Sequence, residues 1–129
     1  MVNSSKRDIF FQQLDSGQLE KVIGSINQQP DYLVDLIDVL AYEPLDIHIR
    51  IGVSAVLETF IGNPFMSKII SPLNQLTHHK EVHLRCDACY FLSLTQQSDA
   101  KDIIEFMLND PYVQVRDAAQ DALDYLSEL

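Results

Sequence analysis

Apolar side chains recur along this chain at intervals of three and four residues, in stripes that short polar segments interrupt. Leu19, Val22, Ile23 and Ile26 have relative offsets of 0, 3, 4 and 7, which place all four on one face of an amphipathic helix. The sequence contains no alternation of apolar and polar positions over the length of a strand. The pattern therefore predicts an all-α fold.

The stripes and their breaks predict eight helical segments joined by short linkers. Short linkers favour the packing of consecutive helices as antiparallel hairpins. Pro72 falls inside the fifth segment, and because proline lacks a backbone N–H we expect it to kink or split that helix. The approximate bounds of the segments are 5–15, 16–28, 31–42, 45–61, 64–77, 81–96, 99–109 and 111–128.

Capping residues mark several of the expected helix starts. Asn63 and Asp110 each precede a proline, which is tolerated in the first turn of a helix because its missing N–H is not needed there. Ser98 is predicted to cap the seventh segment in the same way. Asp15 and Gln18 have the spacing of an N-cap residue and its N3 partner, so Asp15 is predicted to open the second segment.

Three segments carry one motif, which aligns on Arg50, Arg85 and Arg116. Each arginine follows leucine or β-branched residues at the first and third positions before it. A small or medium-sized apolar residue stands three positions after it, and leucine stands seven after it. The motifs are 35 and 31 residues apart, and each follows another predicted helix. A helix pair repeated at this period is typical of an α-solenoid.

The motif resembles the second helix of HEAT repeats, in the short form seen in phycobilisome-lyase-type HEAT proteins. The copy at residues 110–123 resembles it most closely. The resemblance implies an α-solenoid of stacked antiparallel helix pairs, forming a single domain over residues 1–129. Its parts would be a capping helix pair at 1–28 and three repeats at 31–62, 63–97 and 98–129. Such a fold leaves the function open.

The three motif arginines are predicted to be structural. Each lies beside a buried stripe, and a half-buried charge needs a partner. The resemblance implies a ladder of ion pairs from these arginines to acidic residues of neighbouring units. The candidate partners are Asp46, Glu81, Asp87, Asp110 and Asp117.

Positions whose chemistry varies between the copies are candidates for binding. They stand one, four and eight residues after each arginine, and would line a shallow concave face formed by the second helices. The chain would then be a non-enzymatic interaction or scaffold module that binds a protein partner and needs no cofactor. The candidate binding residues are Ile51, Ser54, Glu58, Cys86, Cys89, Ser93, Asp117, Gln120 and Asp124.

Cys86 and Cys89 form a C-x-x-C pair, which supports a second hypothesis, a thiol-redox accessory protein. Their counterparts in the other copies are mostly polar, so we expect both cysteines to be partly exposed. Against this hypothesis, the motif lies inside a helix beyond its first turn, and acidic neighbours raise the pKa of a thiol. A third hypothesis, a HEAT-like lyase or lyase accessory protein, follows from the family resemblance alone.

Histidines and cysteines concentrate between residues 78 and 89. His79, His83, Cys86 and Cys89 are of metal-ligand type, and a zinc site needs four such ligands arranged around one point. One helix cannot easily present four ligands in that way, and no second cluster supports them. These four residues are therefore weak candidates, and no metal site is predicted.

The charge balance narrows the classes of partner. Nine Lys and Arg against nineteen Asp and Glu give a net charge of −10, which disfavours binding to nucleic acid or to an anionic membrane. No apolar stretch has the length of a membrane span or of a signal peptide, so a cytoplasmic protein is expected. Residues 99–129 carry eight acidic and two basic residues, a net of −6. This acidic end predicts either a solvated cap or a docking surface for a basic segment of a partner.

Overall fold

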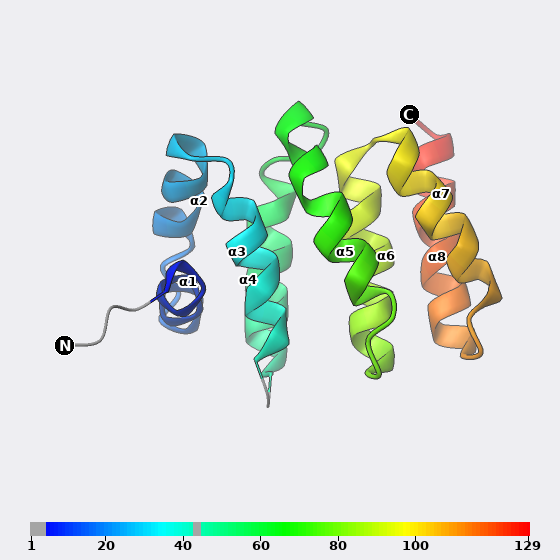
Figure 1. Ribbon diagram of the computed structural model, residues 1–129, viewed down its shortest axis with the longest axis horizontal. Helices are drawn as coiled ribbons and strands as arrows, with labels where there is room; N and C mark the ends of the chain where they lie inside the picture. The colour runs from blue at the N-terminus through cyan, green and yellow to red at the C-terminus, as the bar shows by residue number, and fades with distance from the viewer. Residues whose placement is uncertain (1–4, 43–44) are drawn as a thin grey trace. The chain divides into compact units, whose positions relative to one another are not determined.

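The computed structural model describes residues 5–42 and 45–129. These residues form eight α-helices, three short 3-10 segments and no strand, which confirms the all-α prediction (Figure 1). None of these helices is both long enough and apolar enough to cross a membrane. By its internal contacts the chain divides into two compact units, Met1–Phe60 and Ile61–Leu129.

The first unit is built around α1, which packs against the three other α-helices of the unit. The 3-10 turn η1 extends the third of these helices, so the predicted segment 31–42 is an α-helix that tightens in its last turn. The elements are α1 (Lys6–Asp15), α2 (Leu19–Gln28), α3 (Tyr32–Asp38), η1 (Val39–Ala41) and α4 (Ile47–Glu58).

Close packing of α4 on α1 depends on a glycine. Phe10 and Leu14 of α1 are buried, and Leu14 faces Gly52 of α4. A Cβ atom on Gly52 would lie 3.2 Å from Cδ2 of Leu14, which is tighter than ordinary van der Waals contact. The absence of a side chain at Gly52 therefore allows the two helices to approach.

The prediction that Asp15 opens the second helix is wrong. Asp15 is the last residue of α1, which is followed by Ser16 as its C-cap and by Gly17 with a φ of 75°. A glycine in this left-handed conformation ends a helix, and here it reverses the chain before α2 begins at Leu19. The carboxylate of Asp15 instead contacts His48 of α4, with 2.9 Å between Oδ1 and Nε2.

The second unit has two layers of helices, with α5 and α7 in front of α6 and α8 in Figure 1. The helix α6 packs against α5, α7 and α8, and it therefore buries most of its surface. Its Phe91 and Leu92 are completely buried. The elements are η2 (Pro64–Ile69), α5 (Ile70–Leu76), α6 (Val82–Thr95), α7 (Ser98–Phe106), η3 (Met107–Asn109) and α8 (Val113–Ser127).

The structure confirms two of the helix boundaries predicted for this unit and contradicts a third. Oδ1 of Asn63 accepts the N–H of Phe65 at 3.1 Å, as predicted for a cap. The segment containing Pro72 is split into a 3-10 helix and an α-helix, which confirms the predicted break. Ser98 is the first residue of α7 and not its cap, because the preceding Gln97 occupies the N-cap position without a side-chain bond.

Candidate functional site

Arg85 and Arg116 hold the turn before their own helix in the same way. Nη1 of Arg85 donates to the carbonyl oxygens of His79 and Lys80, six and five positions earlier, at 2.9 and 3.3 Å. Nη1 of Arg116 donates to the carbonyl oxygens six and five positions before it, at 2.8 and 3.1 Å. The two copies of the motif therefore share one local geometry.

The copy around Arg50 shares a different feature with the copy around Arg85. In α4, Nδ1 of His48 lies 3.9 Å from a carboxylate oxygen of Asp46, two residues earlier. In α6, Nδ1 of His83 lies 3.9 Å from a carboxylate oxygen of the residue two positions before it. Arg50 itself is half-buried.

Arg85 also forms a buried bidentate ion pair with Asp110. Its Nε lies 2.9 Å from Oδ2 and its Nη2 lies 3.1 Å from Oδ1, and the two side chains are 11% and 6% exposed. Hydrogen bonding to the guanidinium lowers the pKa of Asp110, and the same contact raises the pKa of Arg85. The ring of Tyr112 lies 5.5 Å from the guanidinium carbon. These contacts tie α6 to the turn before α8.

Asp117 does not extend the predicted ladder. It is exposed, and within the described part of the chain it makes no hydrogen bond or ion pair. The acidic residue of the last copy that pairs with Arg85 is instead Asp110, which lies in the turn before α8 and not within that helix. Arg116 is correspondingly held by backbone carbonyl oxygens.

The residues weighed as metal ligands do not converge. Across residues 5–42 and 45–129, no three His, Cys, Asp or Glu side chains are placed to hold a metal ion. Nδ1 of His79 accepts the N–H of Glu81 at 3.0 Å, which leaves only Nε2 as a protonated nitrogen in the neutral ring. His83 is exposed, and Cys89 is buried.

The expectation that both cysteines are partly exposed is wrong for Cys89. Cys86 is half-buried and Cys89 is 0% exposed, and neither forms a disulfide. Burial raises the pKa of Cys89 to about 12, with further contributions from the neighbouring Cys86 and Asp110. Because the thiolate is the reactive form, Cys89 is a poor nucleophile at neutral pH.

The predicted binding positions are exposed in some copies and covered in others. In α6, Cys89 and Ser93 are 0% and 1% exposed, because this helix has neighbours on three sides. Cys89 therefore presents no exposed surface to a partner, and the side chain of Ser93 can be reached only through the cleft described below. Cys86 and Ser54 are half-buried, and the remaining candidates are exposed, namely Ile51, Glu58, Asp117, Gln120 and Asp124.

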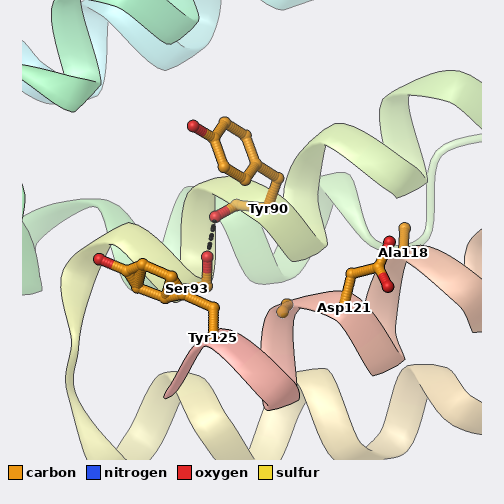
Figure 2. A pocket seen from close by; sticks show the side chains of 6 residues that line it. Tyr90, Ser93, Ala118, Asp121 and Tyr125 are labelled. Atoms are coloured by element: carbon orange, nitrogen blue, oxygen red, sulfur yellow. Dashed lines mark hydrogen bonds between the residues drawn. The ribbon is translucent and has the colours of Figure 1, made fainter. Parts of the chain in front are cut away.

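A cleft of about 280 Å³ lies between α6 and α8. Figure 2 shows that Tyr90 and Ser93 reach it from α6, and that Ala118, Asp121 and Tyr125 reach it from α8. Its lining, completed by Ala122, is mostly apolar. Among these lining residues, only Ser93 belongs to the binding positions predicted from the sequence.

Hydrogen bonds inside the second unit fix the polar groups of the cleft. The hydroxyl group of Ser93 donates to the carbonyl oxygen of Tyr90, as the dashed line in Figure 2 marks. Nε2 of Gln96 donates to the hydroxyl oxygen of Tyr125 at 3.0 Å. Tyr90 is 40% exposed, an unusual position for an aromatic ring on a helix that is otherwise mostly buried.

Asp121 brings an unneutralised charge to the cleft. It is exposed, and the described residues offer it no hydrogen-bond or ion-pair partner. Asp117 and Asp124 lie one turn before and about one turn after it on α8. The cleft therefore combines an apolar floor with an acidic side, and no Lys or Arg is among its lining residues.

A periodic signal in the sequence could have located the cleft. Tyr90 and Asp121 both stand five residues after a motif arginine, and Ala55, the matching residue in α4, is also exposed. After Arg85, the exposed position in α6 is therefore the one five residues later, Tyr90, and not the ones four or eight residues later. An aromatic residue at a position with alanine and aspartate in the other copies was the available clue.

Comparison of the chain with protein-family models, with curated proteins and with solved structures gives no match.

Proposed function

We propose that this chain is a non-enzymatic protein-binding module of HEAT-type helical hairpins, and that α6 and α8 dock a basic segment of a partner protein. Support for the hairpin family comes from the shared backbone contacts of Arg85 and Arg116. The matching histidine–carboxylate distances in α4 and α6 extend the likeness to the copy around Arg50. These contacts support a repeated helical hairpin. They do not involve the side chains that line the cleft between α6 and α8.

The observation that carries the docking proposal is the combination of an apolar cleft and unpaired carboxylates. Ala118 and Ala122 provide a floor that a partner side chain can cover, which releases water from apolar surface. Asp117 and Asp121 provide negative charge that nothing in the described chain neutralises. A basic segment with an apolar or aliphatic stem complements both features.

Electrostatic attraction is expected to set the rate of encounter. The last 31 residues have a net charge of −6, so a basic partner is attracted before contact. Binding should therefore weaken as salt concentration rises, mainly through a slower association rate.

A peptide library tests the docking surface while the natural partner is still unidentified. Random peptides displayed on phage are selected on the immobilised chain, and the enriched peptides are then titrated by fluorescence anisotropy. We expect enriched sequences to contain Lys or Arg beside an apolar residue. The double variant Asp117→Lys/Asp124→Lys should bind them at least about tenfold more weakly, because it places like charge at the surface.

The matched control is Asp99→Lys/Asp102→Lys, which makes the same change of charge on exposed positions of α7. It lowers the net negative charge of the last 31 residues by the same amount, so association should also slow somewhat, but it should bind the peptides clearly more tightly than Asp117→Lys/Asp124→Lys does. Melting temperatures of both double variants show whether the fold is retained. Enrichment of peptides without basic residues, or equal affinity for the two double variants, would contradict the proposed docking surface.

A further inference from the structure

We infer that the cleft between α6 and α8 is a specificity pocket for a single arginine side chain of the docked segment. This inference rests on the proposed function and names the group that the surface recognises. It comes from the lining of the cleft, from the unpaired charge of Asp121 and from a similar arrangement of groups elsewhere in the same chain.

The lining of the cleft suits a flat cation. Tyr90 from α6 and Tyr125 from α8 contribute aromatic rings, and Ala118 and Ala122 contribute methyl groups. A guanidinium group stacks on aromatic faces, is more weakly hydrated than an ammonium group, and has an aliphatic stem that apolar groups can cover. The cleft volume of about 280 Å³ leaves room for a side chain and not for a folded element.

The polar groups of the cleft can accept hydrogen bonds from a guanidinium, which has five donors and no acceptor. The carboxylate of Asp121 has two oxygens without partners in the described chain and can accept a bidentate pair. The proton of the Ser93 hydroxyl is directed to the carbonyl oxygen of Tyr90, so the oxygen of Ser93 presents lone pairs only. A neutral or anionic side chain would leave Asp121 without a counter-charge.

The same chain already binds an arginine in this way. The guanidinium of Arg85 is held by both carboxylate oxygens of Asp110, and its carbon lies 5.5 Å from the ring centre of Tyr112. A carboxylate and a tyrosine ring are the groups that Asp121, Tyr90 and Tyr125 present in the cleft. The internal pair shows that these groups suit a guanidinium, and no lysine or arginine is among the residues that line the cleft.

The test uses a small probe, so that it does not depend on the identity of the partner. Amide chemical shifts of the isotope-labelled full chain are followed by NMR during titration with N-acetyl-arginine amide. We expect saturable shifts at Tyr90, Ser93, Asp121 and Tyr125. N-acetyl-citrulline amide, which replaces the guanidinium by a neutral urea of the same shape, should bind at least about tenfold more weakly.

Variants assign the binding to the cleft. Asp121→Asn should abolish the preference for arginine over citrulline, and Tyr90→Leu should weaken arginine binding while the fold is retained. Asp102→Asn removes one exposed charge from α7, outside the cleft, and should leave the titration unchanged. Equal shifts with arginine and citrulline, shifts confined to residues outside the cleft, or no shift at the solubility limit of the probe would overturn the inference.

Failure of this inference is distinguishable from failure of the proposed function. Library peptides that require Asp117 and Asp124 but bind Asp121→Asn normally would uphold the docking surface and overturn the arginine pocket. Arginine amide that binds in the cleft, together with a library that yields no basic peptide, would uphold the pocket and contradict the docking of a protein segment.

Discussion

The guanidinium of Arg85 contacts both carboxylate oxygens of Asp110 at 2.9 and 3.1 Å, in a site where both side chains are almost completely buried. Arg85 lies near the start of α6, and Asp110 lies in the turn before α8. Oδ1 of Asp110 also accepts the N–H of Tyr112 at 2.9 Å. One carboxylate therefore fixes both the contact between the two helices and the local course of the chain.

Replacement of Asp110 by asparagine should destabilise the protein strongly. The variant leaves the guanidinium of Arg85 buried without a counter-charge, and breaking a buried pair in this way costs about 3–5 kcal/mol. Equilibrium denaturation in urea measures the loss. Asp102→Asn is the matched control, because Asp102 is exposed on α7 and should change the free energy of unfolding by less than about 0.5 kcal/mol. A loss at Asp110 as small as that of the control would contradict the structural role of the pair.

The same pair predicts a loss of stability in acid. Arg85 lowers the pKa of Asp110 in the folded state below its ordinary value of 3.8. The ion pair therefore stabilises the fold fully at pH values above this ordinary pKa, which Asp110 has in the unfolded state, and its contribution disappears as the pH falls through the lower pKa of the folded state. The difference in unfolding free energy between the unmodified chain and Asp110→Asn should shrink as the pH falls below about 4. A difference that stays constant from neutral pH into strong acid would contradict this assignment.

The number and order of the helices could be predicted from the sequence, because each helix carries its own apolar stripe and the linkers between them are short. The helix boundary at Asp15 could not be predicted in this way. Asp15 has the chemistry of a helix start, but Gly17 two residues later adopts a left-handed conformation that ends α1. A capping side chain and a terminating glycine compete in this segment, and the backbone conformation of the glycine decides the outcome.

The candidate site was harder to predict, because exposure depends on how many neighbours a helix has. In the sequence alignment of the three motifs, the positions four residues after each arginine are equivalent, so the prediction gives them the same exposure. Cys89 at that position in α6 is buried among three neighbouring helices, whereas Gln120 in α8 is exposed. Tyr90 is exposed one position further along α6, so a rotation of about 100° around the helix separates the predicted face from the observed one.

The two cysteines should differ sharply in reactivity. Cys86 is half-buried, whereas burial raises the pKa of Cys89 to about 12 and keeps its thiol protonated at neutral pH. An aromatic disulfide reagent should therefore label one thiol in the folded protein and the second only on unfolding. In the variant Cys86→Ser, labelling under native conditions should disappear. Equal labelling rates for both thiols in the folded chain would contradict the burial of Cys89.

A methyl group at Gly62 should disturb both the fold and the cleft. Gly62 has a φ of 71°, and its N–H donates to the carbonyl oxygen of Leu94 at 3.0 Å. A Cβ atom there would lie 2.5 Å from Oε1 of Gln96, the residue whose amide nitrogen holds the hydroxyl group of Tyr125. Gly62→Ala should therefore lower the free energy of unfolding by about 1–2 kcal/mol, from the left-handed backbone alone. Displacement of Gln96 should also shift the NMR signals of Tyr125.

Gly24→Ala is the matched control for this effect. Gly24 lies inside α2, and a Cβ atom added there meets nothing within 4 Å. Alanine is favoured over glycine in a helix interior, so this variant should stabilise the protein by roughly 0.5–1 kcal/mol. Urea denaturation should show that Gly62→Ala lowers the free energy of unfolding and that Gly24→Ala raises it. This difference in sign would separate backbone strain at Gly62 from a general effect of added methyl groups. A neutral or stabilising Gly62→Ala with unchanged Tyr125 signals would mean that Gln96 does not occupy the space beside Gly62.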